Sequence, residues 1–268
     1  MKPRPAFPAQ LELTLARNRP SARGDIATAS VPVAVYFVAD GAPLSAPRAR
    51  MVQLLQKQGI SDPAVLHAMG AIERHRFVDS ALVNQAYEDT SLPIGLGQTI
   101  SKPGVVSRMV ELLRHGAEDA VTDVSKAPRK LGRVLEIGTG CGYQAAVLSR
   151  LAGEVYSIER LRGLHDKARE NLRHLRLPNV HLLFGDGMEG YAKGAPYAAI
   201  IAAAGGEAVP QAWIDQLAVG GRLVAPVATG GVGGASTQAL LVLDKTPQGV
   251  RQTLLEAVHF VPLKSGVA

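Results

Sequence analysis

The stretch VLEIGTGCGYQ at residues 134–144 decides the fold class of this chain. Its apolar start is typical of a buried strand, and the alternating glycines Gly138, Gly140 and Gly142 lead into a new apolar pattern. Glycine has no Cβ and tolerates positive φ, so the backbone can turn sharply into a helix and pass close to a ligand. Such a turn presents unpaired amide N–H groups to the crevice. The stretch therefore predicts a site for a nucleotide-like cofactor.

Strand and helix patterns alternate from Leu131 onward. This alternation predicts parallel strands with helices on both faces of one sheet. The last two apolar runs have no long helix between them, so we expect them to be antiparallel. The predicted fold class is therefore α/β, with a mostly parallel doubly wound sheet and an antiparallel C-terminal addition. The expected strands are 133–137, 154–159, 180–184, 197–203, 222–227, 239–244 and 253–261, and the expected helices are 143–152, 161–175 and 210–218.

The chain begins with a segment of different composition. Residues 1–47 are rich in Pro, Ala, Arg and Ser and have no sustained period. This composition predicts a flexible extension, in which the short apolar run at 31–39 could form one edge strand. The role of the extension does not follow from its sequence.

A helical part is expected between the extension and the sheet. Its apolar residues recur at helical spacing, and Asp62 and Pro63 are typical of an N-cap followed by the first helical position. A loop is expected at 92–103, followed by a further helix. The predicted organisation is a domain at 48–268, made of an N-terminal helical subdomain at 48–115, a surface connection at 115–130 and a cofactor-binding sheet at 131–268.

Charge and cysteine content argue against several classes of protein. The net charge is +6, but residues 1–50 alone carry +4, and only 4% of residues are aromatic, which argues against a nucleic-acid partner. The single cysteine, Cys141, excludes an internal disulfide and, without a Cys/His cluster, argues against a metal site. No apolar run approaches the roughly 18 residues of a membrane span. No apolar segment directly follows Lys2 and Arg4, as it would in a secretory signal. We expect a cytoplasmic monomer that binds no membrane.

Three carboxylates favour one cofactor over another. Glu159 ends the second strand, 21 positions after Gly138, where it could accept hydrogen bonds from ribose hydroxyls. Asp186 follows the third strand, where it could accept from the exocyclic amine of adenine. Glu136 would repel a pyrophosphate but would suit the cationic amino and sulfonium groups of S-adenosylmethionine. These positions, with the tight Gly-x-Gly-x-Gly spacing, favour S-adenosylmethionine, and a dinucleotide remains the alternative.

Over residues 48–268 the chain resembles the protein-L-isoaspartate (D-aspartate) O-methyltransferase family. The most specific motif is GQTISKP at 97–103, because other methyltransferases share only the cofactor motifs. The resemblance implies a Rossmann-like class I S-adenosylmethionine-dependent methyltransferase. The remaining shared motifs are RHRFV at 74–78, YED at 87–89, LPIG at 92–95, VLEIGTGCGYQ at 134–144, GDG at 185–187 and FVPL at 260–263.

The resemblance implies an activity and a set of site residues. The reaction would transfer a methyl group to the free α-carboxylate of L-isoaspartyl and D-aspartyl residues in damaged proteins and peptides, which initiates repair through a succinimide. Ser101 would lie at the substrate carboxylate, with Thr99 and Ile100 lining the same site. The residues expected at the cofactor are Glu136, Gly138, Thr139, Gly140, Gly142, Glu159, Asp186, Gly187 and Gln238.

Alternatives and departures from the family pattern remain open at this point. Ser101 could instead cap the helix that follows Pro103. The chain could also methylate another carboxylate or a small molecule, or act as a non-catalytic binding module, although its intact motifs argue against the latter. Ala198 stands where the family usually has aspartate, and Ala202 begins a run that usually includes threonine. Their effect on cofactor affinity does not follow from the sequence.

Overall fold

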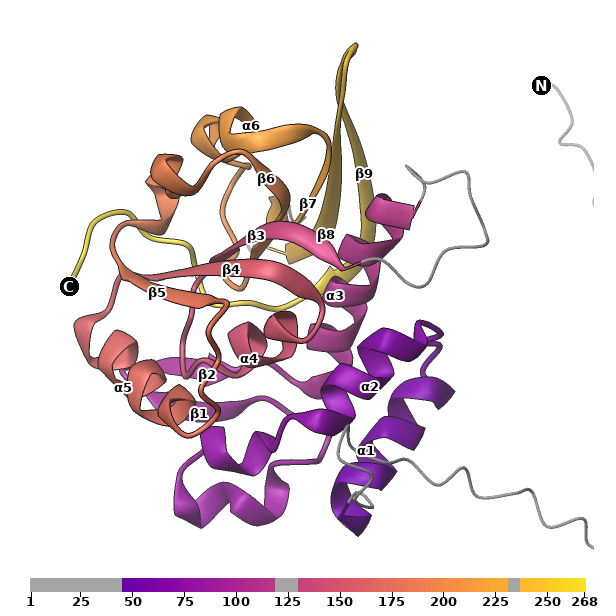
Figure 1. Ribbon diagram of the computed structural model, residues 1–268, viewed down its shortest axis with the longest axis vertical. Helices are drawn as coiled ribbons and strands as arrows, with labels where there is room; N and C mark the ends of the chain where they lie inside the picture. The colour runs from indigo at the N-terminus through magenta and orange to yellow at the C-terminus, as the bar shows by residue number, and fades with distance from the viewer. Residues whose placement is uncertain (1–44, 119–129, 231–236) are drawn as a thin grey trace, which may run out of the picture. The chain divides into compact units, whose positions relative to one another are not determined.

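The computed structural model (Figure 1) describes residues 45–118, 130–230 and 237–268. The extension expected at 1–47, with its apolar run at 31–39, lies almost entirely outside the described residues, as does most of the connection expected at 115–130. The first described helix, α1 (Ala46–Lys57), begins slightly before the expected start of the domain. Among the described helices, none is long and apolar enough to cross a membrane.

A seven-stranded sheet with the strand order β5-β4-β3-β6-β7-β8-β9 forms the centre of the fold. The strands from β5 to β7 in this order are parallel, and β8 and β9 run antiparallel to their neighbours. The predicted doubly wound sheet with an antiparallel C-terminal addition is confirmed. The strands are β3 (Leu131–Ile137), β4 (Ala152–Glu159), β5 (Val180–Phe184), β6 (Tyr197–Ala202), β7 (Leu217–Thr229), β8 (Thr237–Thr246) and β9 (Gly249–Val258).

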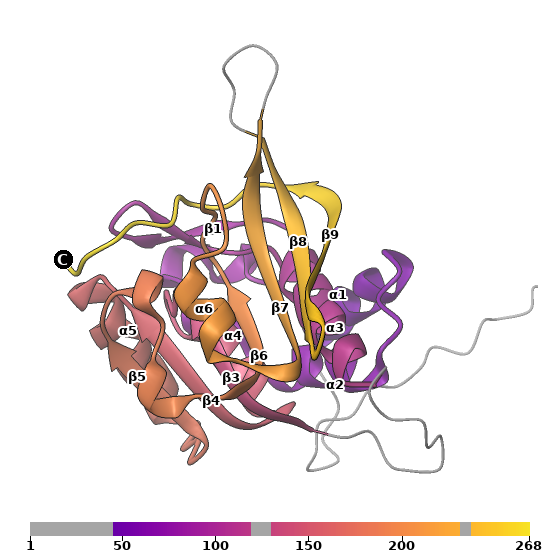
Figure 2. The ribbon, with the colours of Figure 1, turned by 90° about the horizontal axis from the view of Figure 1, so that it is seen from above.

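Helices cover both faces of this sheet. They are α3 (Pro103–Glu118), α4 (Tyr143–Ser149), α5 (Arg162–Arg173) and α6 (Gln211–Gln216), and α2 (Pro63–Ala71) packs against α3 and α4. Successive residues of β6 face opposite sides, so Ile201 belongs to the core shared with α3 and α4, whereas Ile200 belongs to the core shared with α6. Figures 1 and 2 accordingly show α6 on one side of the sheet and α3 and α4 on the other.

Two predicted boundaries differ from the structure where the chain turns tightly. β7 begins at Leu217 rather than at 222, because it follows α6 without a connecting loop. β9 begins at Gly249 rather than at 253. A short turn precedes it, in which Thr246 Oγ1 accepts a hydrogen bond from Gln248 N at 3.2 Å. Both strands therefore begin several residues before the apolar runs from which their starts were predicted.

The loop expected at 92–103 was predicted wrongly, because most of it is a β-hairpin. Its strands, β1 (Leu92–Gly95) and β2 (Gln98–Ile100), form a separate two-stranded antiparallel sheet. Between them Leu96 has φ of +53°, which a leucine rarely adopts. Glycine and proline are rare in strands, so their presence in this segment masked the alternation that would have predicted a hairpin. The buried side chains of Ile94 and Ile100 pack the hairpin against the domain.

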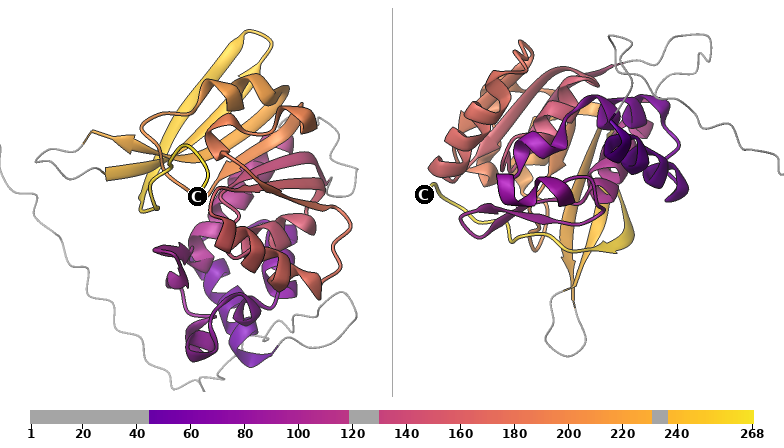
Figure 3. Two further views of the ribbon diagram at one scale, coloured as in Figure 1. Left: turned by 90° about the vertical axis from the view of Figure 1, so that its left-hand side faces the viewer. Right: turned by 90° about the horizontal axis from the view of Figure 1, so that it is seen from below.

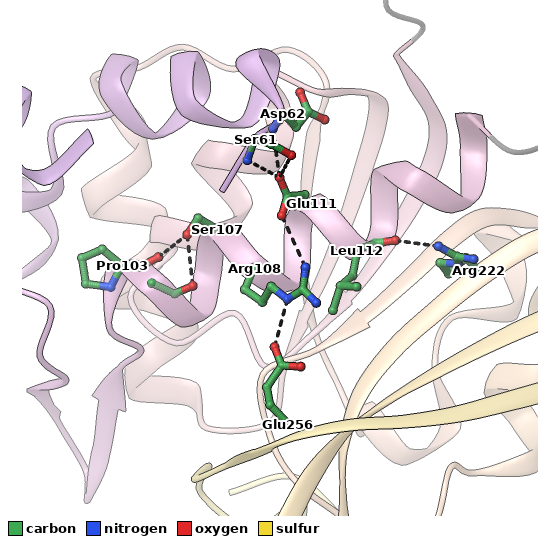
Figure 4. A network of polar contacts seen from close by, with 10 residues as sticks. Ser61, Asp62, Pro103, Ser107, Arg108, Glu111, Leu112, Arg222 and Glu256 are labelled. Atoms are coloured by element: carbon green, nitrogen blue, oxygen red, sulfur yellow. Dashed lines mark hydrogen bonds and ion pairs between the residues drawn. The ribbon is translucent and has the colours of Figure 1, made fainter. Parts of the chain in front are cut away.

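The helix α3 joins the helical part to the sheet through buried polar contacts (Figure 4). The Oε1 atom of Glu111 accepts hydrogen bonds from the backbone nitrogens of Ser61 at 2.7 Å and Asp62 at 2.9 Å. Its other oxygen lies 3.5 Å from Nη1 of Arg108, whose Nε donates to Glu256 of β9 at 2.9 Å. Asp62 also caps α2, as predicted, since its Oδ1 accepts from Ala64 N at 2.8 Å. These contacts orient α3, and the hairpin leads directly into its first turn.

Candidate active site

A cavity of about 480 Å³ lies at the carboxyl ends of the central strands. The chain leaves β3 toward β4 on one side and returns to β6 on the other, so the strand order reverses beside β3. Open α/β sheets bind their ligands at such a reversal. The glycine turn, the β1–β2 hairpin and the C-terminal segment all line this cavity. Figures 2 and 3 show the C-terminal segment running beside the hairpin, so three parts of the chain that are distant in sequence enclose one site.

The glycine turn has the backbone conformation that the sequence predicts. Gly138, Gly140 and Gly142 have φ of +89°, +57° and +91°. Space is also limited, because a Cβ on Gly140 would lie 3.2 Å from Ile94 Cδ1 of the hairpin, and one on Gly142 would lie 3.0 Å from Leu172 Cδ1 of α5. Glycine at these two positions thus permits both the turn and the close packing around it.

Most of the predicted site residues meet in this cavity. Glu159 is almost fully buried at its wall, where its two oxygens accept from Gly140 N and Leu161 N, each at 2.9 Å. The predicted residues that line the cavity are Thr99, Ile100, Ser101, Gly138, Thr139, Gly140, Glu159 and Gly187. The other predicted residues, Glu136, Gly142, Asp186 and Gln238, do not line it.

Glu136 lies beneath the glycine turn rather than within it. Its side chain is fully buried, and its Oε2 accepts a hydrogen bond from Ser157 Oγ, which also contacts Thr139 Oγ1 at 2.7 Å. Burial raises the pKa of Glu136 to about 8, with the nearby Glu159 adding to the shift and Ser157 and Gln144 opposing it. The carboxyl group is therefore mostly neutral at pH 7. Glu136 does not line the cavity, and its contact with the cofactor stays a prediction.

Asp186 and Gln238 hold the C-terminal segment instead of facing the cavity. The Oδ2 atom of Asp186 accepts from Gly266 N at 2.6 Å, and its Oδ1 accepts from Met188 N at 2.8 Å. Gln238 Oε1 accepts from Phe260 N at 2.8 Å, and its Nε2 donates to the Phe260 carbonyl oxygen at 3.3 Å. Both ends of the Gln238 amide are bonded to the Phe260 backbone, and contact between Gln238 and a cofactor stays a prediction. Its polar groups are used by a backbone segment that folds back from the end of the chain.

The C-terminal segment is a wall of the cavity that the sequence did not predict. Residues 261–264 line the cavity, and the backbone beyond them pairs with the end of β4. Ala268 N donates to the Arg160 carbonyl oxygen at 2.8 Å, and the Ala268 carbonyl oxygen accepts from Arg162 N at 2.7 Å. Arg160 itself lines the cavity, so this pairing fixes the segment next to the site.

Ser101 lies where the cavity meets a second one. The second cavity, of about 650 Å³, is lined by parts of α3, β8, the end of β9 and the segment that follows it. Ser101 and Thr99 line both cavities, as do Ala203 and Val261. Buried Arg74 holds this part of the chain, because its Nη2 donates to the Ser101 carbonyl oxygen at 2.8 Å. The end of the hairpin is therefore fixed at the junction.

The side chain of Ser101 does not cap α3. Gly104 N, in the first turn of α3, donates instead to Oδ1 of Asp89 at 2.7 Å. Within the described part of the chain, the Ser101 hydroxyl makes no hydrogen bond. The capping alternative is therefore not supported, and the hydroxyl remains available to a ligand in either cavity.

Sequence reasoning missed Gln144, which also lines the cavity. It is the first-turn polar residue of α4, a helix whose residues are all buried. A polar side chain directly after the glycine turn and within an apolar helix is the signal that could have indicated it. The alanines at positions that depart from the family pattern differ in their relation to the cavity. Ala203 and Ala204 line it, whereas Ala198 and Ala202 do not.

The strand order and the site together define a class of protein. A glycine turn after the central strand, a buried carboxylate ending the next strand, and a cavity at the strand-order reversal are the features of a class I S-adenosylmethionine-dependent methyltransferase. The cavity fits this cofactor, because its polar groups include backbone N–H groups, the carboxylate of Glu159 and the buried Gln144 amide.

Comparison with known proteins identifies the family. The family model described as Protein-L-isoaspartate(D-aspartate) O-methyltransferase (PCMT) matches residues 46–268. The chain is 55% identical over 234 residues to a protein-L-isoaspartate O-methyltransferase of Ralstonia nicotianae, a match that covers 87% of this chain and 73% of that protein. It is 59% identical over 222 residues to one of Leptothrix cholodnii, covering 82% of this chain and 74% of that protein. The chain belongs to the protein-L-isoaspartate (D-aspartate) O-methyltransferase family.

Solved structures share the fold. A protein-L-isoaspartate O-methyltransferase with 28% identity superposes with a TM-score of 0.69 over 82% of this chain and 67% of that chain. A putative protein-L-isoaspartate O-methyltransferase of Plasmodium falciparum, solved in complex with S-adenosyl-L-homocysteine, has 22% identity and a TM-score of 0.63 over 80% of this chain and 97% of that chain. The similarity to the second structure shows the fold alone.

Proposed function

We propose that the two adjoining cavities form the active site at which this chain methylates the free α-carboxylate of isoaspartyl residues in proteins and peptides. The activity and the use of S-adenosylmethionine follow from the family to which the chain belongs. One observation carries the placement of the site: Ser101 and Thr99 line both cavities. The first cavity would hold the cofactor, and the second would receive the polypeptide.

The reaction needs no general base at this site. An α-carboxylate has a pKa of roughly 3.3–3.7, so it is already ionised at neutral pH. When bound, S-adenosylmethionine supplies a methyl group activated by a sulfonium. The protein must therefore place a carboxylate oxygen in line with that methyl group and exclude water from the pair.

Ser101 would orient the carboxylate by donating a hydrogen bond from its free hydroxyl. A neutral donor suits this step, because the carboxylate loses its charge as it is methylated and a cation would stabilise the reactant. The nearby cation Lys102 lines only the second cavity, where its Nζ lies 4.0 Å from Asp89 Oδ2. We propose that Thr99 and Ile100 line the substrate side of the junction.

On the cofactor side, we propose that Glu159 accepts hydrogen bonds from the ribose hydroxyls. Gly140 N and Leu161 N already orient its two oxygens, and each oxygen can accept a further hydrogen bond from a ligand in the cavity that Glu159 lines. We propose that Gly138, Thr139 and Gly187, which also line this cavity, contact the cofactor as well.

The methyl ester made in this reaction leads to repair without further catalysis. The following backbone nitrogen attacks the ester and releases methanol, which gives a succinimide. Hydrolysis of that ring returns part of the material to normal aspartyl residues. We propose that the chain acts on damaged proteins in this way as a cytoplasmic monomer, without a nucleic-acid or membrane partner; sedimentation of the purified chain tests the monomer.

A methylation assay with the variant Ser101→Ala tests the proposed site. With labelled S-adenosylmethionine, an isoaspartyl peptide should gain base-labile methyl groups and the matched aspartyl peptide should not. Loss of one hydrogen bond to a charged group should lower kcat/KM of the variant about 10- to 100-fold. Its affinity for S-adenosylhomocysteine and its Tm should stay unchanged, because the hydroxyl has no partner within the described fold.

Ser80→Ala is the matched control, because Ser80 is exposed and lines neither cavity. It should leave kcat/KM within about twofold of the unsubstituted chain. Equal activity of Ser101→Ala and the unsubstituted chain would contradict the role of Ser101. Cofactor binding without methylation of either peptide would instead favour another carboxylate or a small molecule as the substrate.

A further inference from the structure

Arg74 is a fully buried charged side chain that no step of the proposed reaction uses. It begins the 3₁₀ helix η1 (Arg74–Phe77). Within the described part of the chain it forms no ion pair with a carboxylate, and its Nη1 has no hydrogen-bond partner. Burying a charge without a counter-ion destabilises a fold. A role beyond stability is therefore expected of the contacts that Arg74 does make.

Two other nitrogens of its guanidinium group bind backbone oxygens on either side of the hairpin. Nε donates to the carbonyl oxygen of Ala86, and Nη2 donates to that of Ser101, both at 2.8 Å. Ala86 follows the 3₁₀ helix η2 (Ser80–Gln85), and Ser101 follows β2. Because the guanidinium is planar and rigid, these two bonds fix the Ser101 carbonyl group relative to the segment before the hairpin.

The face of the same guanidinium covers an aromatic ring at the glycine turn. Its Cζ lies 4.8 Å from the centre of the Tyr143 ring. Tyr143 directly follows Gly142, begins α4 and lines the cofactor cavity. Burial raises the pKa of Tyr143 to about 12, and the charge of Arg74 opposes this rise. Attraction between a cation and a ring is strongest where both are removed from water, so this contact ties Arg74 to the start of α4.

Arg74 thus connects two walls of the proposed active site. Tyr143 belongs to the wall beside the cofactor, and Ser101 would hold the substrate carboxylate where the two cavities meet. Methyl transfer requires the carboxylate oxygen and the methyl carbon to be in line, and an error of about 1 Å in such an arrangement can slow a reaction about 100-fold. The two walls come from different elements, so their separation depends on side chains that contact both.

We propose that Arg74 is a positioning residue, which sets the distance and direction between the Ser101 hydroxyl and the cofactor held beside Tyr143. This inference rests on the proposed function. Arg74 lines neither cavity, so it would act through the Ser101 backbone and the Tyr143 ring without touching substrate or cofactor. Its loss should therefore slow methyl transfer more than it weakens the binding of either ligand.

A double-mutant cycle with Arg74→Lys and Ser101→Ala tests the proposal in the full chain. Lysine keeps the charge but has no planar fork with which to bind both carbonyl oxygens. Arg74→Lys should lower kcat for an isoaspartyl peptide about 10- to 100-fold, with KM and the affinity for S-adenosylhomocysteine within about threefold. In the Ser101→Ala background the same substitution should lower kcat less than about threefold, because the hydroxyl that Arg74 positions is already absent.

Arg48→Lys is the matched control for replacing a buried arginine. Arg48 is a buried residue of α1 with its Nη1 3.8 Å from Oε1 of Glu73, and it lines neither cavity. This substitution should leave kcat within about twofold. All rates are expressed per S-adenosylhomocysteine-binding site counted by calorimetry, so a partly unfolded sample still gives a result. If Arg74→Lys leaves too few sites to measure, the uncharged variant Arg74→Gln replaces it in the cycle with the same expected results.

Equal losses of kcat in both backgrounds would overturn the proposal, because Arg74 would then act independently of Ser101. Fewer binding sites with unchanged kcat per site would overturn it as well, because Arg74 would then serve folding alone. An unsubstituted chain that binds S-adenosylhomocysteine but methylates no isoaspartyl peptide would contradict the proposed function itself. That result comes from the unsubstituted chain alone, so it is distinct from a failure of the cycle.

Discussion

Individual side chains around the glycine turn show how burial sets their chemistry. Glu136 is the second-to-last residue of β3 and Glu159 is the last residue of the adjacent parallel strand β4, but only Glu159 lines the cavity. Glu159 accepts from two backbone nitrogens, whereas one oxygen of Glu136 has no partner among the described residues. The same residue type therefore serves as an oriented acceptor at one position and as a mostly neutral buried acid at the other.

The raised pKa of Glu136 predicts a pH-dependent stability. Its pKa is about 8 in the folded chain and near 4.5 when exposed, so the folded state retains a proton that the unfolded state loses. Stability from this group is fully present below the unfolded pKa and is lost as pH rises toward 8. Relative to Glu136→Gln, the free energy of unfolding should fall by about 1.4 kcal/mol per pH unit between these values.

Urea denaturation of the cofactor-free chain at several pH values between 5.5 and 7.5 measures this difference. Glu159 is the carboxylate that raises the pKa of Glu136, and it is present in both proteins, so the comparison isolates Glu136. Parallel stability curves for the chain and for Glu136→Gln would show that the carboxyl group is ionised in the fold.

At the scale of elements, α3 connects the substrate side of the site to the sheet. The buried carboxylate of Glu111 binds the backbone just ahead of α2, and Arg108 reaches the exposed Glu256 on β9 (Figure 4). On the far side, Arg222 Nη1 of β7 donates to the Leu112 carbonyl oxygen at 3.1 Å. The position of α3 determines where Ser101 lies, because Pro103 begins the helix two residues later.

Substitution of Glu111 should therefore destabilise the chain strongly. Glu111→Ala leaves the buried nitrogen of Asp62 and the part-buried nitrogen of Ser61 without an acceptor, which should lower the free energy of unfolding by about 2–4 kcal/mol. Glu256→Ala removes one exposed ion pair from the same network and should change it by less than about 1 kcal/mol. Urea denaturation of both variants checks the contrast, and similar losses would contradict the buried role of Glu111.

At the scale of the whole molecule, the site is closed by segments that lie far apart in the chain. The hairpin, the glycine turn, the end of β4 and residues 261–264 each contribute one wall of the cofactor cavity. Backbone contacts hold the C-terminal segment in place, through Asp186 to Gly266 and through Arg160 to Ala268. The C-terminal segment therefore covers a ligand in this cavity only while these contacts hold the segment against the rest of the domain.

Deletion of residues 265–268 should accelerate cofactor release. The deletion removes the hydrogen bonds from Gly266 N to Asp186 at 2.6 Å and from Ala268 N to Arg160 at 2.8 Å. The bonds from Arg160 Nε to the Gly266 carbonyl oxygen at 2.8 Å and from Arg162 N to the Ala268 carbonyl oxygen at 2.7 Å are lost as well. At about 0.5–1.5 kcal/mol for each bond, the first two losses alone predict a dissociation rate of S-adenosylhomocysteine at least about 5- to 100-fold faster in stopped-flow displacement. Val267→Ser retains the backbone contacts and should release the ligand at the unchanged rate; faster release from this control would show that the side chain, not the backbone, closes the site.

The sequence by itself determined the backbone of the site. The glycine spacing predicted three positive φ values, the alternating apolar runs predicted the parallel sheet, and Asp62 with Pro63 predicted a helix start. These features depend on residues near one another in the chain, because steric limits on φ and the period of burial are local properties. The motif that contains Ser101 also indicated the place where the two cavities meet.

Only the tertiary structure decided which polar groups are free to bind a ligand. Gln238 was expected at the cofactor, yet Phe260 uses both ends of its amide, and Gly266 uses an oxygen of Asp186. Gln144 ends the glycine motif and was not singled out, but its buried nitrogen has no hydrogen-bond partner among the described residues. Whether a polar side chain is satisfied depends on segments that pack against it from far along the sequence, and local patterns do not contain that information.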